Sequence, residues 1–367
     1  MKSPLQRALS LVVTLGLMLG ALLHPPPALS DGAAPATGLV PPLLEIHCID
    51  VGQGEAVLLR TETAAILVDA GIDGTAAAYL NNRGVQRLDL AVATHAHADH
   101  IGGFPAILEQ FQVDRIWYNG QTHTTRTFER FLEAVLESSA VYQEPLRGEL
   151  IRFGELIITV LHPERSAADY SGHLHNKNIV LRADFGDFSI LITGDAEIHA
   201  ENRLLASGIP LAATVLQLGH HGSRTSSSRA FLKAVSPELV FYQAGRDNRY
   251  GHPHREVLLR VDRYLEAEIY GTNTGGTLVI TSDGSSWKIA TSLTAGETTP
   301  PLCIDINTAT IEELSRLIHI SDTRARQIME RRPFTSRQDL LDVPGIGPGR
   351  LREIEDQGLI CPLPGTE

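Results

Sequence analysis

Four side chains of the kinds that bind metal ions lie within six residues of one another: His95, His97, Asp99 and His100. They follow the apolar run 88–93, which is typical of a buried strand, so they lie where a strand gives way to a loop. On an extended segment, side chains two apart project to one side, so His95 and His97 can converge on one ion. After the chain turns, Asp99 and His100 can reach a second metal ion. These donors suit zinc or a similar divalent ion, and the alternative interpretation is a histidine-rich surface turn.

Apolar runs bounded by turn residues predict the strands that would position these side chains, at 43–50, 55–60 and 64–69. Asp50 and Asp69 end the first and third of them. A buried carboxylate needs a partner, so either could accept a hydrogen bond from a metal-binding histidine, and a solvated loop aspartate is the alternative. Gly102 and Gly103 then let the backbone pass close to the ligands before a helix predicted over 104–111.

Three later segments place polar side chains at the ends of predicted elements. A hairpin over 179–193 delivers Asp195, and a strand over 213–218 ends in His220 and His221. Adjacent histidines on an extended chain face opposite ways, so one is expected to bind the second metal while the other faces substrate or packs. The sequence does not decide which. His252 precedes a helix predicted at 256–265, and it could hydrogen-bond a substrate phosphate or have only a capping or solvent role.

These segments resemble the metallo-β-lactamase superfamily, and most closely the soluble hydrolase domain of bacterial competence DNA-uptake channel proteins. The resemblance covers residues 43–292 and is carried by 49–56, 67–71, 94–103, 192–195, 220–223 and 250–254. It implies an α/β fold, the αββα sandwich, in which Asp195 bridges two metal ions. The competence subgroup often has aspartate where His97 stands, so this chain has the fuller ligand set of the wider superfamily.

The resemblance also implies that a histidine-bearing loop at 172–178 supplies a third ligand to the first ion. His173 and His175 both lie in this loop. Relatives of the competence channel tend to carry asparagines here, as at Asn176 and Asn178, so the register stays open. His162, directly before Pro163, is interpreted as part of a turn rather than as a ligand.

The first 30 residues have the pattern of a signal peptide. Lys2 and Arg7 precede an apolar run at 8–23, and small residues at 28–30 suit cleavage after Ser30. The run is short for a bilayer-spanning helix, which needs ~20 apolar residues. We therefore expect export to the periplasm or the cell exterior, no stable membrane insertion after cleavage, and a flexible leader at 31–42; a retained membrane anchor is the alternative.

A change in composition marks a second, all-helical domain at 303–363, after a Thr- and Pro-containing linker at 293–302. The segment 343–351 predicts a glycine hairpin between two helices and resembles tandem helix-hairpin-helix modules that bind DNA. Such a hairpin points backbone N–H groups at a phosphate. The residues expected to do so are Gly345, Ile346, Gly347, Gly349 and Arg350. The first hairpin, at 318–322, lacks the expected glycines, so only one phosphate cradle is predicted; a protein-interaction module is the alternative.

The chain has only three cysteines, which excludes a disulfide-dense scaffold and a thiolate zinc finger. Cys48 alternates with apolar residues and is expected in the core. Cys303 and Cys361 flank the helical module and could form a disulfide in an oxidising compartment.

The formal net charge of −12 means that bulk electrostatics would repel nucleic acid, so contacts with DNA must be local. Residues 31–302 carry 21 Lys and Arg against 32 Asp and Glu. In the C-terminal module, Arg324, Arg326, Arg331, Arg332 and Arg337 cluster in sequence and could neutralise phosphates.

Together these features predict an exported hydrolase that cleaves DNA phosphodiesters with two divalent ions, zinc or alternatively manganese. Asp99 and His252 are the expected catalytic side chains, and the contacts with DNA are expected to be with its backbone. Hydrolysis of another exported ester, such as a phosphorylcholine ester or a β-lactam, is the first alternative, because a fold does not choose its substrate. A DNA-receptor protein with a vestigial hydrolase domain is the second.

Overall fold

The computed structural model describes residues 43–165, 173–293, 303–357, 359–361 and 363. The predicted signal peptide and leader lie outside these ranges, as does the predicted linker from residue 294 onward. Within the described ranges, no helix is long and apolar enough to cross a membrane.

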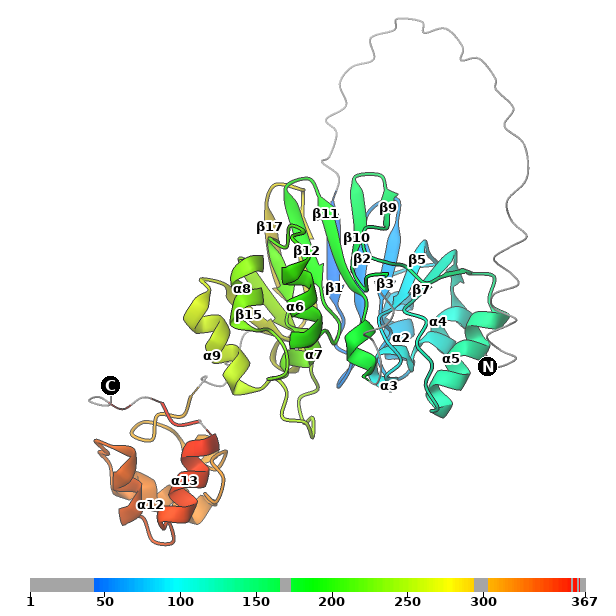
Figure 1. Cartoon of the computed structure of the whole chain (residues 1–367). Coiled ribbons are helices and arrows are strands. Elements are labelled where there is room, and N and C mark those ends of the chain that lie inside the picture. The colour runs from blue at the N-terminus through cyan, green and yellow to red at the C-terminus, as the bar shows by residue number, and fades with distance from the viewer. Residues whose placement is uncertain (1–42, 166–172, 294–302, 358, 362, 364–367) are drawn as a thin grey trace, which may run out of the picture. The chain divides into compact units, whose positions relative to one another are not determined.

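Two β-sheets form the centre of the first domain (Figure 1). In the described part of the chain, the first sheet has eight strands in the order β17-β16-β1-β2-β3-β5-β7-β8, and the second has seven in the order β15-β14-β13-β12-β11-β10-β9. The strands of the first sheet are β1 (Leu44–Cys48), β2 (Val57–Arg60), β3 (Ala65–Val68), β5 (Leu90–Ala93), β7 (Arg115–Tyr118), β8 (Val141–Gln143), β16 (Leu278–Ser282) and β17 (Trp287–Thr291). Those of the second are β9 (Leu150–Phe153), β10 (Leu156–His162), β11 (Val180–Phe185), β12 (Phe188–Ile192), β13 (Val215–Gln217), β14 (Leu239–Tyr242) and β15 (Glu268–Gly271). A short pair, β4 (Arg87–Leu88) and β6 (Gln112–Val113), lies outside both.

Helices cover the outer faces of the two sheets (Figure 1). On the first sheet lie α2 (Thr75–Asn82), α3 (Ala98–Ile101), α4 (Phe104–Gln110) and α5 (Arg126–Glu137). On the second lie α6 (Ile198–Ala206), α8 (Arg229–Val235) and α9 (Arg255–Tyr264), and the short helices η2 (Leu174–Lys177), α7 (Gly219–Gly222) and α10 (Thr272–Gly275) belong to loops. The layers are therefore those of the predicted αββα sandwich.

Helix α5 shows why the sequence forms these layers. Its N-cap, Thr125, accepts a hydrogen bond from the backbone N–H of Phe128 (3.3 Å) and so satisfies an N–H that the helix leaves open. Phe128, Phe131 and Val135 follow at helical spacing and are all buried against the sheet. Burial of one such phenylalanine contributes about 1.5–3 kcal/mol. A separate core between the sheets includes Ile46 and Ile190, both fully buried.

The topology brings polar loops to one edge of the sandwich. Strands β3, β5 and β7 are parallel neighbours, and so are β12, β13 and β14. Ligands of open α/β sheets bind outside the carboxyl ends of parallel strands. Asp69 and His95 follow β3 and β5, and Asp195 and His220 follow β12 and β13. These side chains meet although as many as 151 positions separate the first from the last.

The C-terminal domain has its own core, which includes Leu314, Ile328, Leu340 and Ile354. Its helices are α11 (Ile311–Leu314), α12 (Asp322–Glu330), η3 (Arg337–Asp342) and α13 (Pro348–Gln357). A disulfide joins Cys303 and Cys361, 58 positions apart, as hypothesised from the sequence, and Cys48 is a buried free thiol in the first domain.

Candidate metal centre

Four donor atoms point at one position and could hold a first metal ion. They are His95 Nε2, His97 Nδ1, His175 Nε2 and Asp195 Oδ2, and all lie within 4.8 Å of one another. The two His97 contacts measure 2.9 and 3.0 Å, and the two contacts of Asp195 Oδ2 measure 3.4 and 3.3 Å. Tetrahedral zinc with ligands at roughly 2.0–2.1 Å separates its donors by roughly 3.3 Å. The set therefore fits a tetrahedral ion.

A second set of donors surrounds the other oxygen of Asp195. His100 Nε2 lies 3.2 Å from Asp195 Oδ1, and His221 Nε2 lies 3.6 Å from it and 3.3 Å from Asp99 Oδ2. Three of these atoms, His100 Nε2, His221 Nε2 and Asp195 Oδ1, are buried and have no hydrogen-bond partner among the described residues. Buried polar atoms are rarely left this way, so a cation is the partner that this donor set fits.

Asp195 lies between the two sets, with one carboxylate oxygen in each. It is 1% exposed, and its backbone N–H donates to Asn178 Oδ1 (3.0 Å). Asn178 Nδ2 donates in turn to the carbonyl of Thr193 (2.6 Å). The loop after β12 is thus fixed by one buried amide, which holds the shared carboxylate in place.

The other ring nitrogens of His95, His100 and His221 contact oxygen atoms, which fixes the direction of these three imidazoles. Asp69 Oδ2 contacts His100 Nδ1 at 2.7 Å and also accepts from the hydroxyl of Thr94 (2.7 Å), which lies 3.1 Å from His95 Nδ1. His221 Nδ1 donates to the carbonyl of Gln243 (2.9 Å). Asp69 therefore lies where the sequence suggested an orienting carboxylate. Its backbone has a left-handed conformation, with a φ of 57°.

Asp50 occupies a different environment from Asp69. It is exposed, and its carboxylate accepts from the N–H of Gly52 (3.1 Å) in its own turn. No hydrogen bond joins it to a histidine in the part of the chain that the structure describes. The reason is topological, because Asp50 ends a strand at an antiparallel pair, whereas Asp69 follows a strand that lies parallel to β5.

Two carboxylates that the sequence did not single out lie against the donor sets. Glu197 Oε1 is 3.4 Å from His175 Nδ1 and 3.1 Å from His220 Nδ1. Glu55 is 1% exposed, with Oε1 3.6 Å from His221 Nδ1, and burial raises the pKa of Glu55 to about 8. In the sequence, each of these two residues is only an acidic residue next to a loop of the site, and this alone did not predict a contact with a histidine.

The turn that carries Glu55 packs on α3, the helix that carries Asp99 and His100. The N–H of Glu55 donates to the carbonyl of Asp99 (3.1 Å), and a Cβ on Gly54 would lie 2.5 Å from that same oxygen. Gly54 also has a φ of 151°. Glycine is required here because any side chain would push α3 away from the turn.

The structure places the three histidines whose roles the sequence left open in different surroundings. His175 is 5% exposed and belongs to the first donor set, whereas the His173 side chain is largely exposed, with Nδ1 4.0 Å from Glu197. His162 is buried away from both sets, and its Nδ1 contacts the carbonyl of Asn178 at 2.7 Å.

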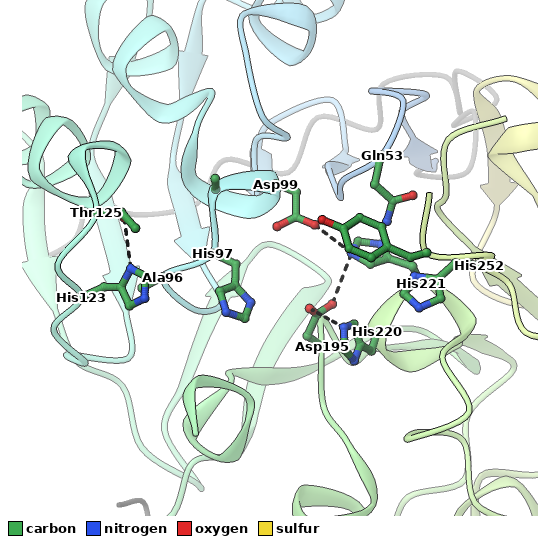
Figure 2. Close-up of a pocket in the computed structure, with 12 residues that line it drawn as sticks. Gln53, Ala96, His97, Asp99, His123, Thr125, Asp195, His220, His221 and His252 are labelled. Carbon is green, nitrogen blue, oxygen red and sulfur yellow. Dashed lines mark hydrogen bonds and ion pairs between the residues drawn. The ribbon is translucent and has the colours of Figure 1, made fainter. Parts of the chain in front are cut away.

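The expectation of an extended chain at His220 and His221 is wrong. Both residues have left-handed conformations, with φ angles of 51° and 57°. Gly222, with a φ of 79°, continues the turn. A left-handed turn does not send neighbouring side chains to opposite faces, so both imidazoles lie beside Asp195 (Figure 2). His221 is in the second donor set, and His220 Nε2 stays 3.6 Å from Asp195 Oδ2, outside both four-atom sets.

Charges within the centre offset one another. Burial lowers the pKa of His95 to about 3 and that of His97 to about 4. Burial acts on His175 in the same direction, but its bonds to Asp195 and Glu197 outweigh this and raise its pKa to about 9. The pKa of His221 is likewise raised to about 9, because Asp195 and Asp99 outweigh burial.

A pocket of about 340 Å³ opens above the two donor sets (Figure 2). His252 lines it and is 8% exposed, with its ring 5.5 Å from that of His220 and 5.8 Å from that of His221. Burial lowers the pKa of His252 to about 4. The sequence-predicted catalytic residues Asp99 and His252 therefore lie on the wall of the same cavity.

The two hairpins of the C-terminal domain have the same backbone. Gly345 has a φ of 85° and His319, at the equivalent position of the first hairpin, a φ of 65°. The N–H of Ile346 donates to the carbonyl of Val343 (2.9 Å), and that of Ile320 to Leu317 (3.1 Å). The first hairpin therefore does form, but it places a histidine, which contacts Glu353, where the second has a glycine.

The residues expected to bind DNA do not all face solvent. Gly347 and Gly349 are exposed, with open space around the place of a Cβ, and Arg350 is exposed with Nη1 bonded to the carbonyl of Gly345 (2.6 Å). Ile346 is 4% exposed and packs in the core, so only its backbone could meet a phosphate. Among the clustered arginines, Arg332 Nε donates to the carbonyl of Ile306 (2.7 Å).

Comparison with protein families agrees with this architecture. A model described as the metallo-beta-lactamase superfamily matches residues 49–245, and one described as a helix-hairpin-helix motif matches residues 303–357. The first match spans more than half of the chain. The chain belongs to the metallo-beta-lactamase superfamily, and it is a hydrolase of that superfamily with a helix-hairpin-helix motif.

Curated relatives include a ComE operon protein, a competence protein and a deoxyribonuclease. The chain is 28% identical over 257 residues to ComE operon protein 3 of Bacillus subtilis (strain 168), covering 64% of this chain and 32% of that protein. It is 37% identical over 217 residues to competence protein ComA of Neisseria gonorrhoeae, covering 58% and 28%. A deoxyribonuclease of Thioalkalivibrio sp. (strain K90mix) is 46% identical over 59 residues, 16% of each chain. The chain spans a third or less of the length of these relatives.

Proposed function

We propose that this protein is an exported phosphodiesterase that cleaves DNA with two divalent metal ions. The observation that carries the proposal is the shared carboxylate of Asp195, with Oδ2 among His95, His97 and His175 and Oδ1 among Asp99, His100 and His221. Such paired sites suit the displacement of an oxygen at phosphorus. The nitrogen-rich donors favour zinc, with manganese as the alternative.

When bound, two divalent ions would supply a water of lowered pKa and positive charge for the phosphate in the transition state. The chain's own residues would do the positioning. Asp69, Glu197 and the carbonyl of Gln243 hold the imidazoles in direction, and Glu55 packs behind His221. His220 and His252 line the cavity, where a phosphate would enter.

Three features support DNA as the substrate and export as the destination. The helix-hairpin-helix motif supplies a hairpin whose exposed glycines suit a phosphate. Two relatives are named for competence and a third is a deoxyribonuclease. The disulfide between Cys303 and Cys361 is of the kind that persists in oxidising compartments.

The test is incubation of the purified chain with end-labelled DNA, as prepared, after dialysis against a chelator, and after return of zinc or manganese. We expect cleavage that the chelator removes and one of the metals restores. Metal-independent cleavage, or none with any divalent ion while a phosphorylcholine ester or a β-lactam is hydrolysed, would overturn the proposal.

A further inference from the structure

Tyr250 is the aromatic side chain on the wall of the pocket. Of the twelve described residues that line the cavity, it alone carries a Phe, Tyr or Trp side chain. It is 50% exposed, whereas Asp195 at the floor is 1% exposed. The ring is thus only half covered by the protein, so part of its surface can meet a ligand in the pocket.

The loop that presents Tyr250 is held rigid by Asn248. The Asn248 Oδ1 accepts the backbone N–H groups of Tyr250 (3.2 Å) and His252 (2.9 Å), and its Nδ2 donates to the carbonyls of Gly245 (2.8 Å) and His252 (2.6 Å). The N–H of Gly245 donates to Gln53 Oε1 (3.1 Å), which ties the loop to the turn beside α3. The backbone that carries the ring is therefore positioned before any substrate arrives, which lowers the entropy cost of binding.

The surroundings of the ring are those of a stacking site. The planes of Tyr250 and His252 are nearly parallel, at 22° with centroids 5.7 Å apart. The guanidinium carbon of Arg249 is 5.0 Å from the Tyr250 centroid, and its Nη2 donates to the tyrosine hydroxyl (2.9 Å). Aromatic rings combined with arginine are the means by which proteins hold unpaired bases, since every base has a π face.

The burial of the donor sets below the pocket also favours an unpaired strand as the substrate. His95 and His100 are fully buried, so a phosphate must enter the cavity to reach the donor sets. A cavity of about 340 Å³ is at the small end of ligand sites, roughly 300–1,000 Å³. An unstacked strand can lead one phosphate into such a space together with the base beside it.

We propose that Tyr250 stacks on the nucleobase next to the phosphate that is cleaved, so that the centre takes an unpaired deoxynucleotide of a DNA strand. The inference rests on the proposed phosphodiesterase function and specifies its substrate. A different role for Tyr250, as a cover that keeps water from His252, predicts equal effects on substrates with and without a base.

The test compares diesters that share a leaving group. The intact chain, loaded with zinc or manganese, is given p-nitrophenyl esters of thymidine 5′-phosphate and thymidine 3′-phosphate, since the base could lie on either side of the phosphate. Methyl p-nitrophenyl phosphate is the base-free reference. The readout is the ratio of kcat/KM for the better thymidine ester to that for the methyl ester, in wild type, Tyr250→Ala and Tyr250→Phe.

Stacking of one base is worth ~1–3 kcal/mol, so Tyr250→Ala should lower the ratio by about 5- to 150-fold, mainly through KM. Tyr250→Phe keeps the ring and should restore it. If Tyr250→Ala leaves the ratio unchanged, or weakens both substrates alike, the stacking inference falls while phosphodiesterase activity stands.

If wild type hydrolyses none of the esters, the proposed function fails separately from the stacking inference. Calorimetry then compares thymidine 5′-monophosphate with deoxyribose 5-phosphate. A preference for the base-bearing ligand that Tyr250→Ala removes would keep the inference, and no preference in wild type would overturn it.

Discussion

The carboxylates of Asp195 and Glu197 face the two ring nitrogens of one imidazole. Asp195 Oδ2 lies 3.3 Å from His175 Nε2, and Glu197 Oε1 lies 3.4 Å from His175 Nδ1. One acid is placed to share a metal ion with the ring, and the other to hold the direction of the ring. Variants of the two acids should therefore fail in different ways.

Replacing Asp195 with alanine removes the oxygen that each donor set shares. We expect metal-dependent hydrolysis to fall by about a thousandfold or more, because the charge contributed by metal ions is worth several kcal/mol. Asp99→Ala should behave similarly. The far-ultraviolet circular dichroism should stay that of wild type, because neither side chain fills the core. Full activity in either variant would refute the metal assignment.

Glu197→Gln keeps the shape of the side chain and removes its charge. We expect metal affinity to fall by about 10- to 100-fold, the usual effect of losing a carboxylate that orients a ligand histidine. Activity should return at high metal concentration, unlike that of Asp195→Ala. Glu164→Gln, at an acid that pairs with Arg147 and does not contact the donor sets, is the matched control. Unchanged metal affinity in Glu197→Gln would contradict the orienting role.

Metal binding should release protons. The pKa of His175 and of His221 is about 9 in the metal-free chain, and that of His100 is raised as well, because carboxylates outweigh burial. Since the pKa values of His175 and His221 lie above 7, these two rings are protonated at pH 7, and zinc should displace about two protons from them there and fewer at pH 9. Calorimetry in buffers of different ionisation enthalpy measures this number. Binding that releases no proton at pH 7 would contradict the charge pattern.

Much of the centre follows from spacing, and the remainder depends on contacts between distant segments. His95, His97, Asp99 and His100 are close in sequence and fall on one loop, so their type and order were enough to predict a metal site. His175 could not be separated from His173, because His173 lies directly before a one-turn helix and His175 lies within it, and contacts with neighbouring segments set the direction of that helix. Likewise, Asp50 and Asp69 both end apolar strands, and only the strand order places Asp69 below His100.

The C-terminal hairpin should hold long DNA. Gly347→Asp introduces a negative charge where a phosphate would approach, and a side chain there meets no atom within 4 Å, so the fold should survive. We expect a higher apparent KM for long DNA with little change in turnover of bis(p-nitrophenyl) phosphate, since a tether raises local concentration only. Gly347→Ala is the uncharged control, and deletion of residues 303–367 should resemble Gly347→Asp. If Gly347→Asp and the deletion variant both cleave long DNA as well as wild type does at every salt concentration, the C-terminal domain is better explained as a protein-interaction module.

The disulfide should stabilise the small C-terminal domain. Cys303→Ser opens a loop closed by residues 58 positions apart, which should cost about 2–4 kcal/mol. The C-terminal domain should unfold at a lower denaturant concentration. The unfolding of the first domain and the turnover of the small diester should not change. Mass spectrometry of the unreduced chain should find the linked peptides. Two free thiols in protein from an oxidising compartment would end this prediction.

Each donor set draws its atoms from both layers of the sandwich. His95, His97, Asp99 and His100 belong to the loop and helix after β5 of the first sheet, whereas His175, Asp195 and His221 belong to loops of the second. An ion in either set would be a cross-link between the two halves of the fold. Because a ligand that binds only the folded state stabilises it, loading with metal would also close this edge of the sandwich to proteases. The same ions would thus decide how long the folded chain resists proteolysis.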